Sequence, residues 1–215
     1  DPNQAIFYTS GRASNEAAFL YQLFVRQYGT NNFPDCSNMC HEPSGSGMRP
    51  QIGVGKGTVT LHDFECADAL FIFGQNPGTN HPRMLAELRD AHKRGARIVS
   101  FNPLRERGLE RFADPQNKME MATLGSSPIS THYFQLRVGG DFAAVKGMMK
   151  HVLEQEDQRG GVLDHAFIAE HTTGFEALAA DLRAESWALL EQESGLTEAQ
   201  IRAAGDIYIG AKNVI

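Results

Sequence analysis

The chain has 215 residues, 41% of them hydrophobic and 21% charged, with a formal net charge of −6. This length fits one domain, or one domain with a piece of another, and the composition is that of a soluble globular protein. The negative charge argues against nucleic-acid binding, and no apolar run approaches the roughly 20 residues of a membrane helix. Three cysteines are too few for a disulfide framework, so we expect a cytoplasmic protein.

Both ends of the chain indicate a fragment. Asp1 is not an initiator methionine, and the chain stops at Ile215 in an apolar run where a buried strand would begin. We therefore expect the chain to be part of a longer protein.

The first quarter of the chain predicts a strand, a helix and a loop. The apolar run 5–10 is typical of a strand. Ser14 is a suitable N-cap and Gly29 a suitable C-terminal cap for an amphipathic helix. The stretch from 30 to 56 is rich in Gly, Pro, Asn and Ser and predicts a loop, and loops of that length are usually functional or disordered. The apolar face of the helix comprises Leu20, Phe24 and Tyr28.

A strand–helix–strand unit follows. The apolar run 69–73 predicts a buried strand, and 96–103 predicts a second. Between them the pattern predicts a helix with Pro82 near its first turn and Gly95 at its end. This spacing is that of a βαβ unit, which requires a parallel sheet covered by helices.

The rest of the chain predicts one more strand and then helices. Residues 133–141 predict a third strand that ends in a glycine turn. Asp141 is expected to cap the helix that follows. The pattern is helical from Leu163 onward, and 213–215 begins a fourth strand. The segment 114–131 fits neither pattern and predicts a surface insertion.

Two local patterns support the helices in this second half. The helix after Asp141 has an apolar face formed by Val145, Met148, Met149, Val152 and Leu153. Thr197 and Gln200 have the spacing of a capping box. The predicted fold is α/β: a Rossmann-like parallel sheet flanked by helices, with a helical C-terminal part.

Small polar residues follow three of the predicted strands. They lie at 74–80, at Asn102 and Pro103, and at 139–141. Ligands of open parallel sheets bind beyond the carboxyl ends of the strands, and glycines let them approach the backbone. A nucleotide-bearing ligand is therefore one interpretation. Ordinary turn chemistry explains the same residues equally well, and the sequence has neither a G-x-G-x-x-G fingerprint nor a P-loop.

The cysteines and histidines leave several roles open. Cys36 and Cys40 are spaced C-x3-C, which is neither a redox motif nor a zinc motif, and Cys66 is expected to be a small core residue. Cys40 with His41 is a possible nucleophile and base, or a soft thiolate for a metal carried by a cofactor. The remaining histidines considered are expected to be surface or hydrogen-bonded residues: His62, His92, His132, His151, His165 and His171.

Several longer runs occur together and in order across essentially the whole chain. They are TSGR-x2-NE, YGTNN, C-x3-CHEPSG, VGKGTVTL, FGQNPGTNHPRML, GARIVSFNPLRERGLERFADP and RVGGD. This arrangement resembles the molybdopterin oxidoreductases, specifically the formate-dehydrogenase-like catalytic subunits and their YdeP-type branch.

The resemblance implies a molybdenum or tungsten ion held by two molybdopterin guanine dinucleotides. Cys40 matches the position of the metal ligand, and His41 that of the neighbouring histidine that helps to move a proton. A 4Fe-4S cluster is implied in the part of the protein that precedes this fragment, with a small-molecule substrate and an electron-transfer protein as partners. The resemblance also implies that residues 1–35 are the edge of a neighbouring domain and that residues 36–215 form a dinucleotide-binding domain. The residues that match the dinucleotide loops are Gly74, Gln75, Asn76, Thr79, Asn80, Asn102, Pro103, Gly139, Gly140 and Asp141.

The chain also departs from the family pattern in two places. Asn102-Pro103-Leu104 stands where the family commonly has Asp-Pro-Arg, and Glu42 follows His41 where formate dehydrogenases favour Gly. Two alternatives remain at this point. One is a catalytically silent relative that serves as a scaffold in a redox complex, and the other is a cysteine-dependent hydrolase.

Overall fold

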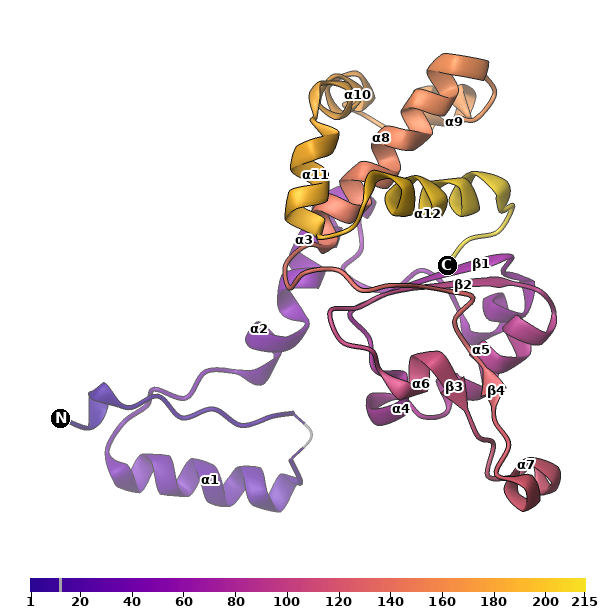
Figure 1. Cartoon of the computed structure of the whole chain (residues 1–215). Helices are drawn as coiled ribbons and strands as arrows, with labels where there is room; N and C mark the ends of the chain where they lie inside the picture. The colour runs from indigo at the N-terminus through magenta and orange to yellow at the C-terminus, as the bar shows by residue number, and fades with distance from the viewer. Residues whose placement is uncertain (12) are drawn as a thin grey trace. The chain divides into compact units, whose positions relative to one another are not determined.

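The computed structural model describes residues 1–11 and 13–215, the side chain of Met39 excepted. The chain forms two compact units, Asp1–Thr58 and Val59–Ile215, and each is described by itself (Figure 1). The expected domain boundary at residue 35 concerns the longer protein and stays a prediction. Within the described residues, no helix combines the length and the apolar character needed to cross a bilayer.

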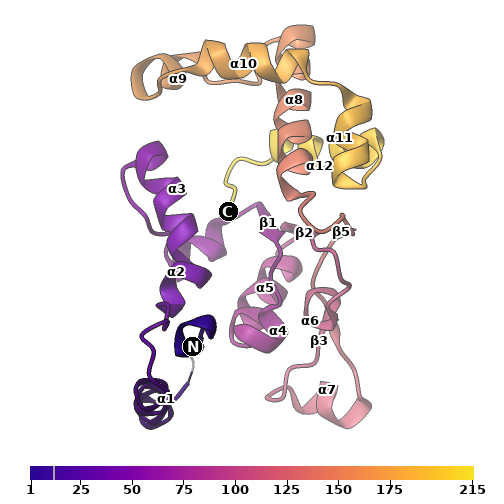
Figure 2. The same ribbon diagram turned by 90° about the vertical axis from the view of Figure 1, so that its left-hand side faces the viewer.

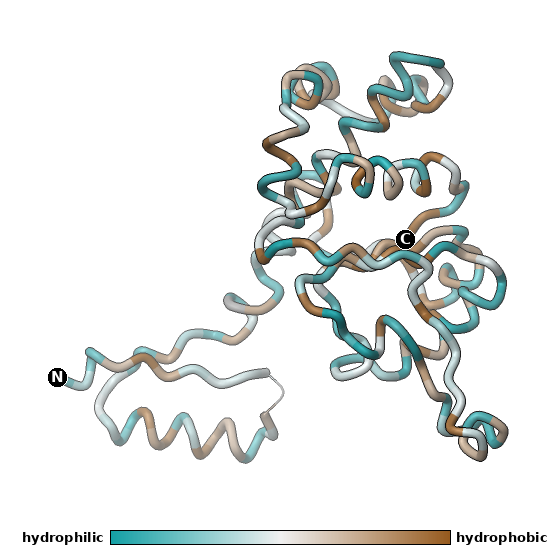
Figure 3. The backbone as a smooth tube through the Cα atoms, in the orientation of Figure 1, coloured by the Kyte–Doolittle hydropathy of each residue, from teal (hydrophilic) through white to brown (hydrophobic). Residues whose placement is uncertain are grey.

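The first unit contains the predicted amphipathic helix, α1 (Asn15–Tyr28). The Ser14 hydroxyl accepts a hydrogen bond from the Ala17 N–H at 3.2 Å, and Gly29 ends the helix at φ 99°. Apolar and polar residues alternate along α1 (Figure 3). Val25 is buried, but the predicted apolar face at Leu20 and its neighbours is largely exposed. The caps are thus confirmed, whereas the unit itself covers little of the apolar face.

The predicted strand at 5–10 is wrong. A short 3-10 turn, Pro2–Gln4, precedes this segment, and the segment itself is irregular. Phe7 donates its N–H to the Asn32 carbonyl at 2.9 Å, and its ring packs edge-on against Tyr28 with centroids 5.1 Å apart. A strand needs a ladder of such bonds with a neighbour. The apolar residues here serve an aromatic cluster instead.

The predicted loop at 30–56 is also wrong, because it contains helices α2 (Cys36–Cys40) and α3 (Glu42–Ile52). Asp35 begins α2 by accepting from the N–H of Ser37 at 3.2 Å. A proline in the first turn of α3 and Gly53 at φ 78° delimit the second helix. Some of the Pro and Gly residues that indicated a loop mark the ends of α3 instead, whereas Pro50 lies inside it.

The second unit is built on a parallel sheet, as predicted. Strands β1 (Ala69–Phe73), β2 (Arg97–Phe101) and β5 (His132–Phe134) pair in the order β1-β2-β5. The third strand is therefore much shorter than the predicted 133–141. Residues 213–215 add to the other side of β1, where the Phe71 N–H donates to the Ile215 carbonyl at 2.7 Å. The spatial order of the strands thus reverses beside β1.

Helices cover both faces of this sheet (Figure 2). On one face lies α5 (Met84–Lys93), which buries Leu85, Leu88 and Ala91. The helix begins at Met84, so Pro82 lies near its first turn, as the sequence indicated. A separate short turn, α4 (Pro77–Asn80), precedes it and is capped by the Asn76 side chain.

The opposite face carries the helical part of the chain. α8 (Asp141–Arg159) and α12 (Glu198–Gly210) pack against β2 and β5, and the capping box of Thr197 and Gln200 is confirmed. Asp141 is not the cap of α8, since Gly140 takes that position and no side chain caps the helix. The remaining helices are α9 (His165–His171), α10 (Phe175–Ala184) and α11 (Trp187–Ser194).

The predicted insertion at 114–131 is a surface feature only in part. After α6 (Arg107–Glu110), strand β3 (Arg111–Phe112) pairs antiparallel with β4 (Ser127–Pro128), and α7 (Lys118–Thr123) lies between them. Ile129 then enters the core and is fully buried. Ile129 comes directly after β4, so the chain returns to the core before residue 131, the predicted end of the insertion.

The cysteine and histidine expectations have different outcomes. Cys66 ends a 3-10 turn, Leu61–Cys66, and is exposed, so its predicted place in the core is wrong; Ala67 is buried instead. The expectation for the histidines holds for His151, which is buried between two partners. Its Nε2 lies 2.7 Å from an Asp206 carboxylate oxygen, and its Nδ1 lies 2.8 Å from an Arg202 nitrogen.

Candidate functional site at the carboxyl edge of the sheet

The loops that follow β1 and β2 are in direct backbone contact. Gly74 leaves β1 at φ 62° and donates its N–H to the Phe101 carbonyl at 2.9 Å. A Cβ added to Gly108 would lie 2.8 Å from the Gly78 Cα, closer than real contacts allow. Glycine is therefore required where the two loops touch. The sequence places this pair at the edge where a parallel sheet binds its ligands.

The predicted polar side chains of the β1 loop are engaged with their neighbours. Asn76 accepts from the Thr79 N–H at 3.3 Å and donates to a Glu106 carboxylate oxygen at 2.9 Å. The buried Asn102 approaches the Gln75 carbonyl at 3.4 Å. Asn80 belongs to the same helical turn and donates its N–H to the Asn76 carbonyl at 2.9 Å. The structure thus brings these predicted residues together around Asn76 and Asn102.

The β2 loop is held by side chains from β5 and the residue after it. The carbonyl of Pro103 accepts from the Gln135 side-chain amide at 2.8 Å. The Tyr133 hydroxyl donates to the Leu104 carbonyl at 2.7 Å and accepts from the Glu106 N–H at 3.1 Å. Three successive parts of this loop are therefore fixed by hydrogen bonds.

The third predicted cluster lies between β5 and α8. Gly139 has φ 82°, and a Cβ on Gly140 would lie 2.8 Å from the Ser194 carbonyl oxygen. Asp141 is the first residue of α8 and is partly exposed. All three clusters follow strands that run in parallel, so they lie at one edge of the sheet. That common placement is what the sequence predicted for them.

Cys40 and His41 belong to the first compact unit. Cys40 is the last residue of α2, and its free thiol is exposed. His41 ends the helix, and its main-chain N–H donates to the Ser37 carbonyl at 3.2 Å. Hydrogen bonds from Ser37, chiefly from its hydroxyl, lower the pKa of Asp35 at the other end of α2.

The donor set of the described residues fits a metal that arrives with its own ligands. These residues contain no group of three or more His, Cys, Asp or Glu side chains arranged to hold a metal. The exposed Cys40 thiol, which a histidine follows in the sequence, suits a single additional bond to such an ion. The glycine contacts at the sheet edge likewise suit a ligand that lies against backbone.

Sequence reasoning missed three residues of this edge, namely Glu106, Arg107 and Gly108. Together with Asn76 and Thr79 they line a polar cavity of about 310 Å³ between α4 and α6. The sequence did contain a signal for these residues. Charged residues of both signs and a glycine follow Pro103 closely, directly after a predicted strand.

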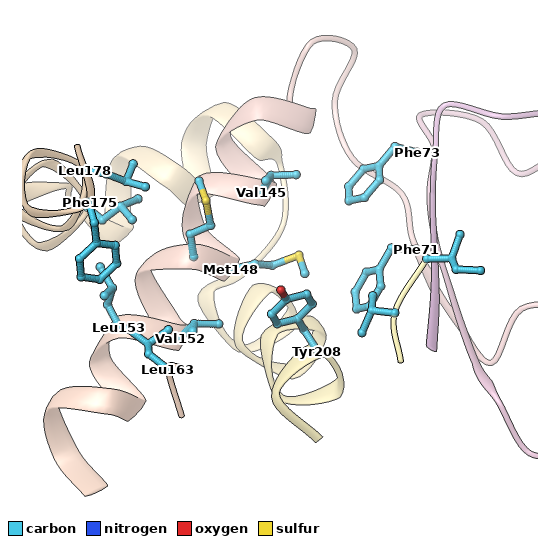
Figure 4. A pocket seen from close by; sticks show the side chains of 14 residues that line it. Phe71, Phe73, Val145, Met148, Val152, Leu153, Leu163, Phe175, Leu178 and Tyr208 are labelled. Atoms are coloured by element: carbon cyan, nitrogen blue, oxygen red, sulfur yellow. The ribbon is translucent and has the colours of Figure 1, made fainter. Parts of the chain in front are cut away.

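A second, apolar hollow lies on the face of the sheet and not at its edge. Figure 4 shows Phe71 and Phe73 of β1 on one side of it, with Val145 and Met148 of α8 on the other. The hollow has a volume of about 480 Å³. Tyr208 brings the one hydroxyl to an otherwise apolar lining. Such a surface offers packing but little chemistry, so the polar edge is the candidate site.

The fold is a Rossmann-like α/β domain, and its strand ends carry the candidate ligand site. The family model for molybdopterin oxidoreductases matches residues 1–134. Protein YdeP of Escherichia coli is 54% identical over 220 residues, which cover 100% of this chain and 29% of that protein. The chain belongs to the molybdopterin oxidoreductase family.

Two more distant proteins also match the chain. Formate dehydrogenase H of Escherichia coli is 28% identical over 206 residues, which cover 95% of this chain and 26% of that enzyme. Acetylene hydratase from Pelobacter acetylenicus superposes with a TM-score of 0.63 at 20% identity, over 89% of this chain and 23% of that chain. The latter supports the fold. The chain spans less than a third of the length of each of these proteins.

Proposed function

We propose that this chain is part of a formate-dehydrogenase-like oxidoreductase. In this proposal it holds one of two molybdopterin guanine dinucleotides and gives a thiolate to their molybdenum or tungsten ion. The observation that carries the proposal is the glycine-locked edge formed by the loops after β1 and β2, within a chain of the molybdopterin oxidoreductase family. The 4Fe-4S cluster, the small-molecule substrate and the electron-transfer partner belong to the longer protein.

In this proposal the chain's own residues hold the group and manage a proton. Asn76, Thr79 and Asn102 would line the dinucleotide, and the Gly139–Asp141 turn would lie along its other end. When bound, the metal supplies two-electron redox chemistry. The Cys40 thiolate would bind it directly, and an imidazole nitrogen of His41 would accept the proton that the substrate releases.

The strand order provides further support. Residues 213–215 lie on one side of β1 and β2 on the other, so the order reverses at β1. Open α/β sheets bind dinucleotides in the crevice at such a switch point. The loop after β1 therefore lies where a dinucleotide is expected.

The three free cysteines are consistent with a reducing compartment, which we take to be the cytoplasm.

The test compares Cys40→Ser with Cys36→Ser in the full-length protein, because both residues lie on α2. We expect Cys40→Ser to abolish turnover with an artificial electron acceptor, and to remove one sulfur neighbour from the metal in X-ray absorption spectra. Molybdopterin content should stay at the wild-type level in both variants, and Cys36→Ser should keep its activity. Purified wild-type protein without molybdenum or tungsten would instead support the silent scaffold.

A further inference from the structure

The apolar hollow between the sheet and the helices is a large unfilled space. Phe71 and Phe73 of β1 border it on one side, and α8, α10 and α12 supply most of the remaining lining (Figure 4). Its volume of about 480 Å³ is about three times the roughly 150 Å³ of a cavity that takes up one benzene molecule. Leu178, Met149 and Val145 of its lining stay 45%, 37% and 36% exposed. Apolar side chains that are exposed together in this way mark an interaction surface.

The backbone of β1 bonds to its two sides in alternation. The Asp68 carbonyl accepts from the Arg97 N–H at 2.8 Å, and the Gly74 N–H donates to the Phe101 carbonyl at 2.9 Å. Both partners belong to β2, so the even-numbered residues from 68 to 74 bond to that strand. The odd-numbered residues direct their N–H and carbonyl groups to the opposite side, where residues 213–215 lie.

This opposite side of β1 is paired along only part of the strand. The Phe71 N–H donates to the Ile215 carbonyl at 2.7 Å, and the Ile215 N–H donates to the Ala69 carbonyl at 3.1 Å. The next two groups in the row are the Phe71 carbonyl and the Phe73 N–H. Within residues 1–11 and 13–215, neither group has a partner on this side. Open backbone groups beside an apolar surface are a template for a further stretch of strand.

The apolar lining and the open strand edge together restrict what can occupy the hollow. None of the described lining residues is charged, and Tyr208 has the only hydroxyl among them. A lipid or another small apolar molecule would fill the space but leave the backbone groups of β1 without partners. An extended segment does both, because its main chain pairs with the strand edge while alternate side chains enter the apolar space.

The segment best placed to do this is a continuation of residues 213–215. These residues already run parallel to β1, and a covalent continuation needs no separate association. The chain covers 29% of protein YdeP, its relative at 54% identity, so a protein of that length extends well beyond this chain. We propose that the hollow is the docking surface for the residues that directly follow Ile215 in the longer protein. They extend the parallel strand past Phe73 and fill the hollow with apolar side chains.

The strand register determines which of these residues fill the hollow. Val214 and Ile215 both border it, but Ile215 also packs against the core beside α5. Because side chains alternate along a strand, the first and third residues after Ile215 should face the hollow. The second should accept from the Phe73 N–H and donate to the Phe71 carbonyl. A charged residue at the first or third position of the full-length sequence would overturn the proposal.

The test uses full-length protein and two matched cysteine variants. Leu178 is 45% exposed and lines the hollow, whereas Leu189 is 42% exposed and does not line it. Leu178→Cys should react with N-ethylmaleimide about tenfold or more slowly than Leu189→Cys, because its thiol is reached only when the docked segment opens locally. Mass spectrometry of the peptides measures both rates, with the denatured variants as references. Equal rates in the native proteins would show an open hollow and overturn the proposal.

Hydrogen–deuterium exchange of wild-type full-length protein is a second measurement that needs no variant. The Phe73 amide should be protected as strongly as the Phe71 amide, which donates to the Ile215 carbonyl. A slow reaction of Leu178→Cys together with free exchange at Phe73 would assign the hollow to a small apolar ligand instead. A slow reaction that becomes fast on dilution would assign it to a second copy of the protein. None of these measurements involves the cofactor, so their outcome is independent of the proposed function.

Discussion

The polar cavity and the apolar hollow both border the same strand, β1, yet they offer opposite chemistry. Phe71 and Phe73 of the strand itself line the apolar hollow, whereas the residues that follow the strand, from Asn76 on, line the polar cavity. Side chains within a strand lie on the faces of the sheet and are covered by helices. Residues beyond its end leave the core, so glycine and polar groups are tolerated there. The contrast separates the packing role of β1 from its binding role.

The largest effect is expected from a substitution in the core of the sheet, which supports both the polar cavity and the apolar hollow. Phe101 of β2 is fully buried, and its ring stacks on Phe73 with centroids 4.6 Å apart. Phe101→Ala should cost about 3–5 kcal/mol of unfolding free energy, because it leaves a cavity in the core. Hydrogen–deuterium exchange of the full-length protein should accelerate in both β1 and β2.

The matched control is the exposed Leu104, which follows the same strand. Leu104→Ala should change the unfolding free energy by less than about 0.5 kcal/mol. If Phe101→Ala accelerated exchange only in the loops and not in the strands, the shared support would be refuted.

A smaller effect is expected from a substitution in the loops that line the polar cavity, and it should leave the apolar hollow unchanged. Gly108→Ala places a Cβ against the Gly78 backbone and should cost roughly 1–3 kcal/mol through overpacking. Exchange should rise in the peptides that contain 74–80 and 102–112, and the helices around the apolar hollow should stay unchanged. Gly210→Ala is the control, since nothing lies within 4 Å of a Cβ there. Equal exchange in the two variants would show that the loops are not locked.

The smallest effect concerns the apolar side and depends on pH. Glu156 bonds to His165 at 2.8 Å and accepts from the N–H groups of Val162 and Leu163, and Leu163 lines the apolar hollow. These contacts, with His165 the largest, lower the pKa of Glu156 to about 2 from an ordinary 4.5. A lowered carboxyl pKa stabilises the fold above pH 4.5, and this stabilisation is lost as pH falls from 4.5 towards 2.

Glu156→Gln should therefore lower the melting temperature at neutral pH, and its difference from wild type should shrink as the pH falls through that window. Glu193→Gln changes an exposed glutamate near the end of α11 and serves as the control, with no pH-dependent difference expected. A difference between Glu156→Gln and wild type that is constant down to pH 2 would contradict the assignment.

Much of the second unit could be predicted because local pattern and tertiary packing agree there. The continuous apolar run at 69–73 is typical of a buried strand, and the spacing of Leu85, Leu88 and Ala91 is typical of a helix packed on a sheet. The helices α2 and α3 could not be predicted, because Pro and Gly serve both as helix boundaries and as loop residues. Whether a Pro or Gly marks a helix end or a loop can be decided only when the extent of the helix is known.

The candidate site divides in the same way. Residues such as Gly74 and Asn102 were accessible from sequence because they follow strand ends directly. Glu106 was not, since its role depends on a contact with Asn76, 30 positions away in sequence, and on a hydroxyl from β5. Contacts between loops on different strands have no periodic signature. The roles of Cys40 and His41 at a metal stay a prediction.

The return of residues 213–215 to the side of β1 has a consequence for how the protein is made. Asn213 donates its main-chain N–H to the Asp68 carboxylate across a separation of 145 residues. During synthesis, β1 and β2 can pair early, but the other side of β1 stays unpaired until α12 and residues 213–215 have left the ribosome. Closure of such a distant contact is slow, and an unpaired strand edge is prone to association with other chains. We therefore expect nascent chains truncated before residue 213 to aggregate or recruit chaperones more readily than chains that include it.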